Sequence, residues 1–209
     1  MIAIIDYKAG NLRSVAKALE FIGEDAAVTQ DSDCISKADG VILPGVGAFA
    51  DGLESLESVG LDGVIREVID KGTPFLGICL GYQMLFDYSE EHAGNGNIVK
   101  GLGIFRGAVR QIPQNMGLKV PHMGWNNLLI QTESALFSGL PDSPFVYFVH
   151  SYYVDSDDRS IVSARCRYGI PFDVAISTGK VFGTQFHPEK SGDIGIAMLK
   201  NFMKVVRGE

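Results

Sequence analysis

Short apolar runs alternate with helical stripes along the first 86 positions of the chain. Residues 2–5, 41–43 and 73–76 are apolar runs of the length that buried strands have. The stripes between them have helical spacing and end near Gly23 and Gly72, and residues 80–86 continue the third run as a further helix. Their apolar members are Leu12, Val15, Ala16, Leu19 and Ile22, and then Leu61, Val64, Ile65, Val68 and Ile69. This alternation predicts an α/β fold whose central parallel sheet is flanked by helices.

The pattern changes from about residue 94 onwards. Residues 94–97 (Gly-Asn-Gly-Asn) predict a mobile loop, and residues 104–185 have the short apolar runs and turns of mostly antiparallel strands. Helical periodicity returns at the end, where one apolar face consists of Ile194, Ala197, Met198, Phe202 and Val205. Because no repeat or linker divides the chain, we expect a single domain over residues 1–209.

Composition and charge narrow the classes of function. The chain has 18 basic and 25 acidic residues, a net charge of −7, and its Lys and Arg are scattered, so nucleic acid is not an expected partner. It has no basic leader and no apolar stretch of membrane-spanning length, so we expect no membrane association. Three widely spaced cysteines indicate neither a disulfide framework nor a zinc cluster. We therefore expect a soluble cytoplasmic protein without a metal or a cofactor.

Cys79 lies between Gly77 and Gly81, where a predicted strand meets a predicted helix. This Gly-x-Cys-x-Gly pattern is that of a nucleophile elbow, in which the nucleophile has a strained backbone and flanking side chains would clash with the crossing strand and helix. The N-terminus of the following helix favours a thiolate over a thiol. Cys79 is therefore the predicted nucleophile, whereas Cys34 and Cys166 are expected to be ordinary small apolar residues.

A thiol nucleophile needs a base, and His187 is the strongest candidate among the four histidines. We expect a strand to carry His187 to its end, where Pro188 stops the ladder. Glu189 can then fold back onto the imidazole, fix its tautomer and stabilise the imidazolium.

The developing oxyanion of an acyl transfer needs backbone donors. The elbow supplies the N–H of Leu80, and the turn at residues 44–49 should supply a second N–H, from Val46 or Gly47. The same turn also matches a dinucleotide fingerprint, Gly45-x-Gly47-x-x-Ala50. Two features disfavour that interpretation: Pro44 interrupts the passage from strand to turn, and the next strand ends in Cys79 instead of an acidic residue.

Gly-x-Cys-x-Gly-x-Gln together with the distant Phe-His-Pro-Glu resembles the class I glutamine amidotransferases. Further segments at residues 6–12, 44–49, 122–126, 149–153 and 183–191 look like the glutaminase subunits of imidazole glycerol phosphate synthase. The resemblance spans nearly the whole chain in the expected order. It implies a three-layer, flavodoxin-like α/β fold and hydrolysis of L-glutamine to L-glutamate and ammonia through a cysteine thioester.

The resemblance also implies roles for individual residues. Cys79 would be the nucleophile, His187 the general base and then acid, and Glu189 the residue that orients it. The residues implied in binding glutamine are Gln83, Glu91, His150, Ser151 and Tyr152. Glu91 has the charge that an α-ammonium group needs, although it could also be a solvated loop charge.

A partner is implied as well: a (β/α)₈ cyclase subunit that uses the ammonia to make imidazole glycerol phosphate and an aminoimidazole carboxamide ribotide in histidine biosynthesis. Members of the family are typically weak glutaminases until the partner holds its nucleotide. The residues implied at the partner interface and ammonia exit are His122, Met123, Trp125 and Asn126, although Trp125 could instead be a core aromatic residue. The alternatives are the glutaminase of another amidotransferase, such as pyridoxal phosphate synthase, which should lack residues 122–126, and a non-catalytic regulatory module.

Overall fold

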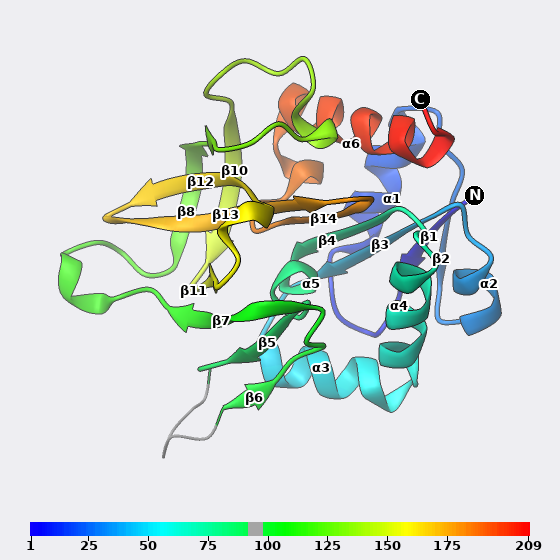
Figure 1. Cartoon of the computed structure of the whole chain (residues 1–209), viewed down its shortest axis with the longest axis horizontal. Coiled ribbons are helices and arrows are strands. Elements are labelled where there is room, and N and C mark those ends of the chain that lie inside the picture. The colour runs from blue at the N-terminus through cyan, green and yellow to red at the C-terminus, as the bar shows by residue number, and fades with distance from the viewer. Residues whose placement is uncertain (92–97) are drawn as a thin grey trace.

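The computed structural model describes residues 1–91 and 98–209, so the loop predicted at residues 94–97 lies outside the described residues. Strands and helices alternate over the first half of the chain, and strands dominate from residue 99 to residue 184 (Figure 1). The strands are β1 (Ile2–Ile5), β2 (Ala26–Thr29), β3 (Gly40–Gly45), β4 (Phe75–Cys79), β5 (Phe86–Ser89), β6 (Val99–Lys100), β7 (Phe105–Gln111), β8 (His122–Asn127), β9 (Leu129–Ile130), β10 (Phe145–His150), β11 (Tyr152–Ser156), β12 (Val162–Tyr168), β13 (Ile170–Thr178) and β14 (Val181–Thr184). The α-helices are α1 (Leu12–Phe21), α2 (Ser32–Ser36), α3 (Phe49–Ser58), α4 (Leu61–Asp70), α5 (Leu80–Gln83) and α6 (Gly192–Arg207), and the 3₁₀ turns are η1 (Gln114–Met116), η2 (Ala135–Phe137), η3 (Arg159–Ile161) and η4 (Pro188–Lys190).

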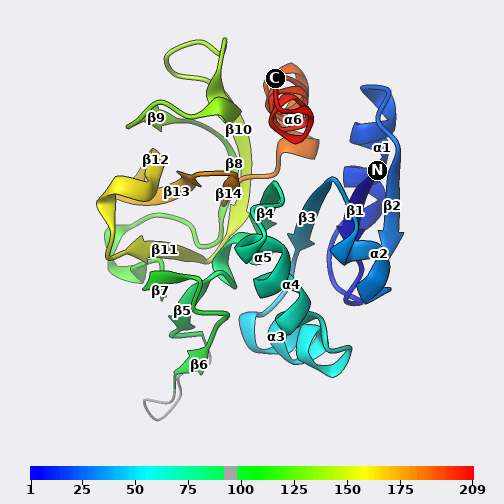
Figure 2. The same ribbon diagram turned by 45° about the vertical axis from the view of Figure 1, so that its right-hand side comes forward.

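Most of the described strands join one sheet in the order β2-β1-β3-β4-β14-β13-β11-β7-β5-β6. The first five strands in this order are mutually parallel, and antiparallel pairs dominate from β14 to β6. β8 and β10 form a separate antiparallel pair, which lies beside β12 (Figure 2). The sequence prediction of a parallel first half and a mostly antiparallel second half is confirmed.

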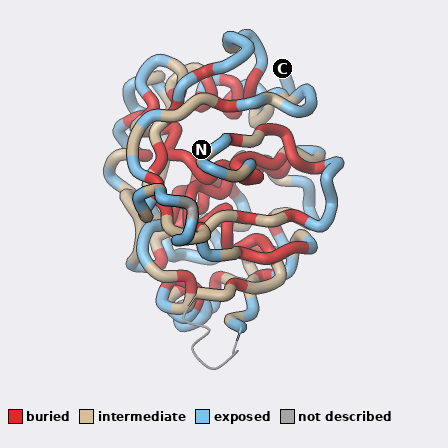
Figure 3. The backbone as a smooth tube through the Cα atoms, turned by 90° about the vertical axis from the view of Figure 1, so that its left-hand side faces the viewer, coloured by how far each residue is buried: buried red, intermediate tan, exposed pale blue. Residues whose placement is uncertain are grey.

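The alternation of side chains along β1 shows how the layers form. Ile2 and Ile4 face a core cluster that α1 and α6 complete, whereas Ala3 and Ile5 face a second cluster completed by α2, α3 and α4. All four residues are buried, as expected for a strand covered on both faces. Buried backbone runs through the centre of the molecule, with exposed segments outside it (Figure 3). The predicted three-layer α/β architecture is therefore present.

Two local predictions are wrong. The helix expected at residues 80–86 is a single turn, α5, and Phe86 begins β5, where it pairs with Phe105 of β7. Most residues of this short run are apolar, so its periodicity did not distinguish a short helix followed by a strand from one longer helix. The sequence prediction also missed β2, α2 and α3.

Pro44 does not interrupt the third strand in the chain. β3 continues through Pro44 to Gly45, and Pro44 pairs with Ile78 of β4. Pairing of β3 with β1 has already ended at Ile42, so the missing N–H of proline is tolerated there. One of the two arguments against the dinucleotide fingerprint is therefore wrong.

Candidate active site

Cys79 ends β4 and directly precedes α5. Its backbone has φ of 55° and ψ of −108°, a left-handed conformation that non-glycine residues rarely adopt. A Cβ atom on Gly81 would lie 1.9 Å from the carbonyl oxygen of Leu43, and one on Gly77 would lie 2.9 Å from the carbonyl oxygen of Gly81. Both glycines are therefore required, and the predicted elbow geometry is confirmed.

His187 and Glu189 form a buried pair. The imidazole Nδ1 lies 2.8 Å from Oε1 of Glu189, and each side chain is 1% exposed. The backbone holds the imidazole in place, because the His187 N–H donates to Tyr147 and the His187 carbonyl accepts from the Ser191 hydroxyl. His187 precedes η4, three residues past the end of β14, so its expected place at the end of a strand is wrong. The pairing with Glu189 is nevertheless as expected.

The electrostatics of this pair favour an imidazolium. Burial by itself would lower the pKa of His187, but the neighbouring Cys79 and Glu189 side chains outweigh burial and raise the pKa to about 9. Within the described part of the chain, Nε2 of His187 and Oε2 of Glu189 have no hydrogen-bond partner. His187 can therefore hold a proton beside Cys79, and its Nε2 is free to transfer it.

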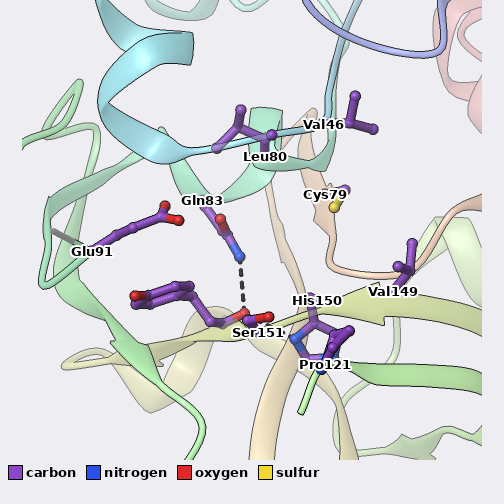
Figure 4. Close-up of a pocket in the computed structure, with 11 residues that line it drawn as sticks. Val46, Cys79, Leu80, Gln83, Glu91, Pro121, Val149, His150 and Ser151 are labelled. Carbon is purple, nitrogen blue, oxygen red and sulfur yellow. Dashed lines mark hydrogen bonds between the residues drawn. The ribbon is translucent and has the colours of Figure 1, made fainter.

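A cavity of about 400 Å³ opens at Cys79 and gathers residues from distant parts of the chain (Figure 4). Its lining residues are Val46, Gly47, Cys79, Leu80, Gln83, Glu91, Pro121, Val149, His150, Ser151 and Tyr152. The structure thus brings the predicted oxyanion and substrate-binding residues together with Cys79, the predicted nucleophile. Pro121 and Val149 were missed as lining residues, although Pro121 directly precedes the segment at residues 122–126 and Val149 begins the segment at residues 149–153.

The Gln83 amide is oriented by two acceptors. Its Nε2 donates to the Tyr152 carbonyl at 3.0 Å (Figure 4). The same nitrogen also donates to Oε1 of Gln185 at 2.9 Å. Both N–H groups are therefore used, and the carbonyl oxygen of Gln83 is left as the acceptor for a ligand.

Glu91 is anchored to the wall of the cavity. Its Oε2 accepts the backbone N–H of Phe49, the first residue of α3, at 2.6 Å. A carboxylate at a helix N-terminus is stabilised by the helix dipole. Glu91 is thus an ordered cavity residue and not a solvated loop charge, and its second oxygen can accept from an ammonium group.

The two expected oxyanion segments border the sulfur. Leu80 directly follows Cys79 and is buried, whereas Val46 is 40% exposed and Gly47 has φ of +103°. A non-glycine residue would be strained at position 47. The choice between Val46 and Gly47 as the second donor stays a prediction.

The residues expected at the partner interface lie on two opposite faces of strand β8. Met123 and Trp125 are 62% and 56% exposed, so Trp125 is not a core aromatic residue. His122 is buried, because successive side chains of a strand point to opposite faces, and a direct partner contact of this imidazole is not expected. Asn126 is partly buried beside His122.

Comparisons with known proteins agree with this site. The family profile described as "Glutamine amidotransferase class-I" matches residues 3–206. "Imidazole glycerol phosphate synthase subunit HisH" of Moorella thermoacetica is 50% identical, and the subunit of that name from Bacillus cereus (strain G9842) is 52% identical. Each of these alignments covers 99% of this chain and 95% of the relative. The chain belongs to the HisH family of class I glutamine amidotransferases.

Proteins outside the HisH family share this fold. A solved structure described as "Structure of PurLQS from Thermotoga maritima" aligns with a TM-score of 0.74 over 98% of both chains, at 18% sequence identity. At this identity the likeness concerns the fold alone. The HisH relatives, in contrast, match at about half of all positions along nearly the whole chain.

Proposed function

We propose that this chain hydrolyses L-glutamine through a γ-glutamyl thioester on Cys79 and passes the ammonia to a cyclase subunit in histidine biosynthesis. The observation that carries the proposal is a strained cysteine elbow that opens into the same cavity as Gln83 and Glu91 and is electrostatically coupled to the buried His187–Glu189 pair. The match to HisH relatives over nearly the whole chain supports the biosynthetic role.

In the first half of the reaction, the Cys79 thiolate attacks the carboxamide carbon of glutamine. The Leu80 N–H and an N–H from Val46 or Gly47 would stabilise the oxyanion. The carbon–nitrogen bond breaks as the His187 imidazolium gives its proton to the leaving nitrogen. Ammonia leaves, and a thioester to Cys79 remains.

In the second half, neutral His187 removes a proton from water, which attacks the thioester carbon. The carbon–sulfur bond then breaks, glutamate is released, and the thiolate is restored beside the imidazolium. Glu189 keeps Nδ1 of His187 protonated throughout, so that Nε2 is the nitrogen that exchanges protons.

Recognition of glutamine follows from the cavity wall. The Glu91 carboxylate would pair with the α-ammonium group, and the Gln83 carbonyl oxygen would accept an N–H of the substrate. His150, Ser151 and Tyr152 form the opposite wall.

The proposed partner is a cyclase subunit with a (β/α)₈ barrel, and the proposed contact includes Met123 and Trp125. Val149 supports this site, because it lines the cavity and pairs with Met123 of β8, so the exposed strand borders the nucleophile cavity. Large exposed apolar side chains such as Trp125 are typical of interfaces.

We also propose that residues 1–209 act as one domain, since both core clusters pack against the same sheet. The cytoplasm is the proposed location, because its reducing conditions would keep the Cys79 thiol free. No helix among the described residues is long and apolar enough to cross a membrane.

The test compares the wild type, Cys79→Ala and Cys34→Ser in the presence of a cognate cyclase and its nucleotide. Glutamate release should fall about a thousandfold or more in Cys79→Ala, because a group that forms the covalent intermediate is removed. Cys34→Ser, on α2, should keep the wild-type rate. Equal rates for wild type and Cys79→Ala would refute the assignment of the nucleophile.

Ammonium salts provide the second arm of the test. The Cys79→Ala complex should still form the cyclised product when ammonium is supplied, since only the glutamine-dependent half is lost. Failure of added ammonium to restore product would mean that Cys79 also supports the assembly of the complex.

A further inference from the structure

A continuous series of buried and partly buried hydrogen bonds leads away from Cys79. Nε2 of Gln185 lies 3.6 Å from the sulfur of Cys79 and donates to it. Oε1 of Gln185 accepts from Gln83, which also donates to the Tyr152 carbonyl. That carbonyl also lies 2.9 Å from Nδ1 of His150. Gln185 is fully buried, so its amide has no access to water as an alternative partner.

The series continues into strand β8. Nε2 of His150 lies 2.9 Å from Nδ1 of His122, and Nε2 of His122 lies 3.3 Å from the Asn126 amide nitrogen. The bonds therefore connect the sulfur with the strand whose other face carries Met123 and Trp125.

The donors and acceptors fit only one assignment of the imidazole protons if both histidines are neutral. The Tyr152 carbonyl can only accept, so His150 must carry its proton on Nδ1 and accept at Nε2. His122 must then donate from Nδ1, which leaves its Nε2 to accept from Asn126. Each histidine thus fixes the proton position of the next.

The surroundings keep both rings neutral. Burial lowers the pKa of His122 to about 4. Burial, with smaller contributions from His122 and His187, lowers the pKa of His150 to about 3 despite its bond to the Tyr152 carbonyl. The His122 ring is also stacked against Phe148 and Tyr168, at centroid distances of 4.8 and 4.1 Å. The ring is therefore held by packing as well as by hydrogen bonds.

We propose that Gln185 stabilises the Cys79 thiolate by donating to its sulfur, and that His150 and His122 are positioning residues that hold this donor in place through Tyr152 and Gln83. Loss of the His122 donor would leave Nε2 of His150 unpaired. A buried acceptor without a partner is unfavourable, so the His150 ring would turn to find another donor, which would remove one of the two bonds to the Tyr152 carbonyl and loosen the Gln83 and Gln185 amides. The inference rests on the proposed role of Cys79 as nucleophile.

The test measures the pKa of the Cys79 thiol from the pH dependence of its alkylation by iodoacetamide. A Cys34→Ser background removes the partly exposed thiol, and Cys166 is fully buried. Gln185→Met keeps the chain length and removes the donor. Since an ionised acceptor makes the lost bond a strong one, we expect the thiol pKa to rise by about one unit and alkylation below the midpoint to slow about tenfold.

Two variants of His122 distinguish a role in positioning the hydrogen bonds from a role in packing. His122→Phe keeps an aromatic ring between Phe148 and Tyr168 but removes both nitrogens, and it should raise the thiol pKa in the same direction as Gln185→Met. His122→Asn loses the ring but places an amide nitrogen near the position of Nδ1, so its thiol pKa should stay near that of the wild type. A merely structural role would lower the melting temperature of both variants and leave the thiol pKa unchanged.

Unchanged thiol pKa values in folded Gln185→Met and His122→Phe would overturn the inference. An independent measurement uses the wild type alone: nitrogen NMR should show the proton on Nδ1 of both His122 and His150, and an Nε2 proton on either ring would also overturn it. Neither measurement needs glutamine turnover. The inference can therefore fail while the proposed glutaminase activity holds, and the glutaminase activity can fail while the inference holds.

Discussion

Alanine substitutions at the elbow glycines should destabilise the protein by different amounts, because the distance from each new Cβ atom to its neighbours differs. A Cβ atom on Gly81 would lie 1.9 Å from the Leu43 carbonyl oxygen, whereas real contacts stay beyond 3.0 Å, so the two groups must separate by about 1 Å. Leu43 is in β3 and pairs with Gly77 of β4, so its carbonyl cannot retreat without disturbing the parallel sheet.

The magnitudes follow from these distances. Overpacking a core costs about 1–3 kcal/mol, and a clash with backbone belongs at the upper end, so Gly81→Ala should lose about 3 kcal/mol or more of unfolding free energy. Gly77→Ala meets the Gly81 carbonyl oxygen at 2.9 Å, a smaller overlap with backbone than at Gly81, and should lose about 1–2 kcal/mol. Gly63→Ala is the matched control: it lies in α4 with no atom within 4 Å of the new Cβ, and it should gain about 0.5–1 kcal/mol.

Urea denaturation of the three variants checks the order, and alkylation of Cys79 reports on the elbow. Gly81→Ala should also slow alkylation, since the displaced helix N-terminus no longer stabilises the thiolate. A Gly81→Ala protein as stable as Gly77→Ala, or a Gly63→Ala protein less stable than wild type, would refute the steric reasoning.

Three further predictions concern charge and the exposed strand. Glu189→Gln removes one cause of the raised pKa of His187, so the alkaline limb of the glutaminase pH profile should move to lower pH, and an unmoved limb would contradict the pairing. His122 and His150 have folded pKa values below the ordinary 6.5, so the unfolded state takes up protons first and the unfolding free energy should fall as pH drops from 6.5 towards 4. In urea titrations at several pH values, the unfolding free energy of His122→Phe should fall less steeply with decreasing pH than that of the wild type. An equal dependence on pH would contradict the burial argument. Trp125→Ala should change the unfolding free energy by less than about 0.5 kcal/mol but weaken binding of a cognate cyclase about tenfold or more in calorimetry.

Phe21 provides the matched control for Trp125. It is a large apolar side chain that is 77% exposed, and it ends α1, which lies away from β8 in both ribbon views (Figures 1 and 2). Phe21→Ala should leave cyclase binding unchanged. Equal weakening by both substitutions would mean that general surface apolarity, and not the β8 face, determines binding.

Features set by neighbouring residues could be predicted from the sequence. The Gly-x-Cys-x-Gly elbow could be predicted because a Cβ atom would clash at two positions, where only glycine fits. The His187–Glu189 pair could be predicted because its members are two residues apart, with a proline between them. The order of strands and helices in the first half follows from apolar periodicity for the same reason. The short elements β2 and α2 carry too few residues to show it, and the ten-residue α3 was missed.

Features that depend on long-range pairing were decided only by the tertiary structure. Residues 80–86 divide into a helical turn and a strand because Phe86 finds a partner in β7, and Pro44 stays in β3 because pairing to β1 has already ended.

The sequence by itself determined the Cys79 elbow, the His187–Glu189 pair and the parallel half of the sheet, since these rest on local backbone geometry and on the period of apolar residues. Only the tertiary structure placed His122 inside and Trp125 outside, because a strand alternates its faces and packing decides which face is covered. It also brought Gln185 to the sulfur of Cys79, a contact between residues 106 positions apart that no local pattern encodes.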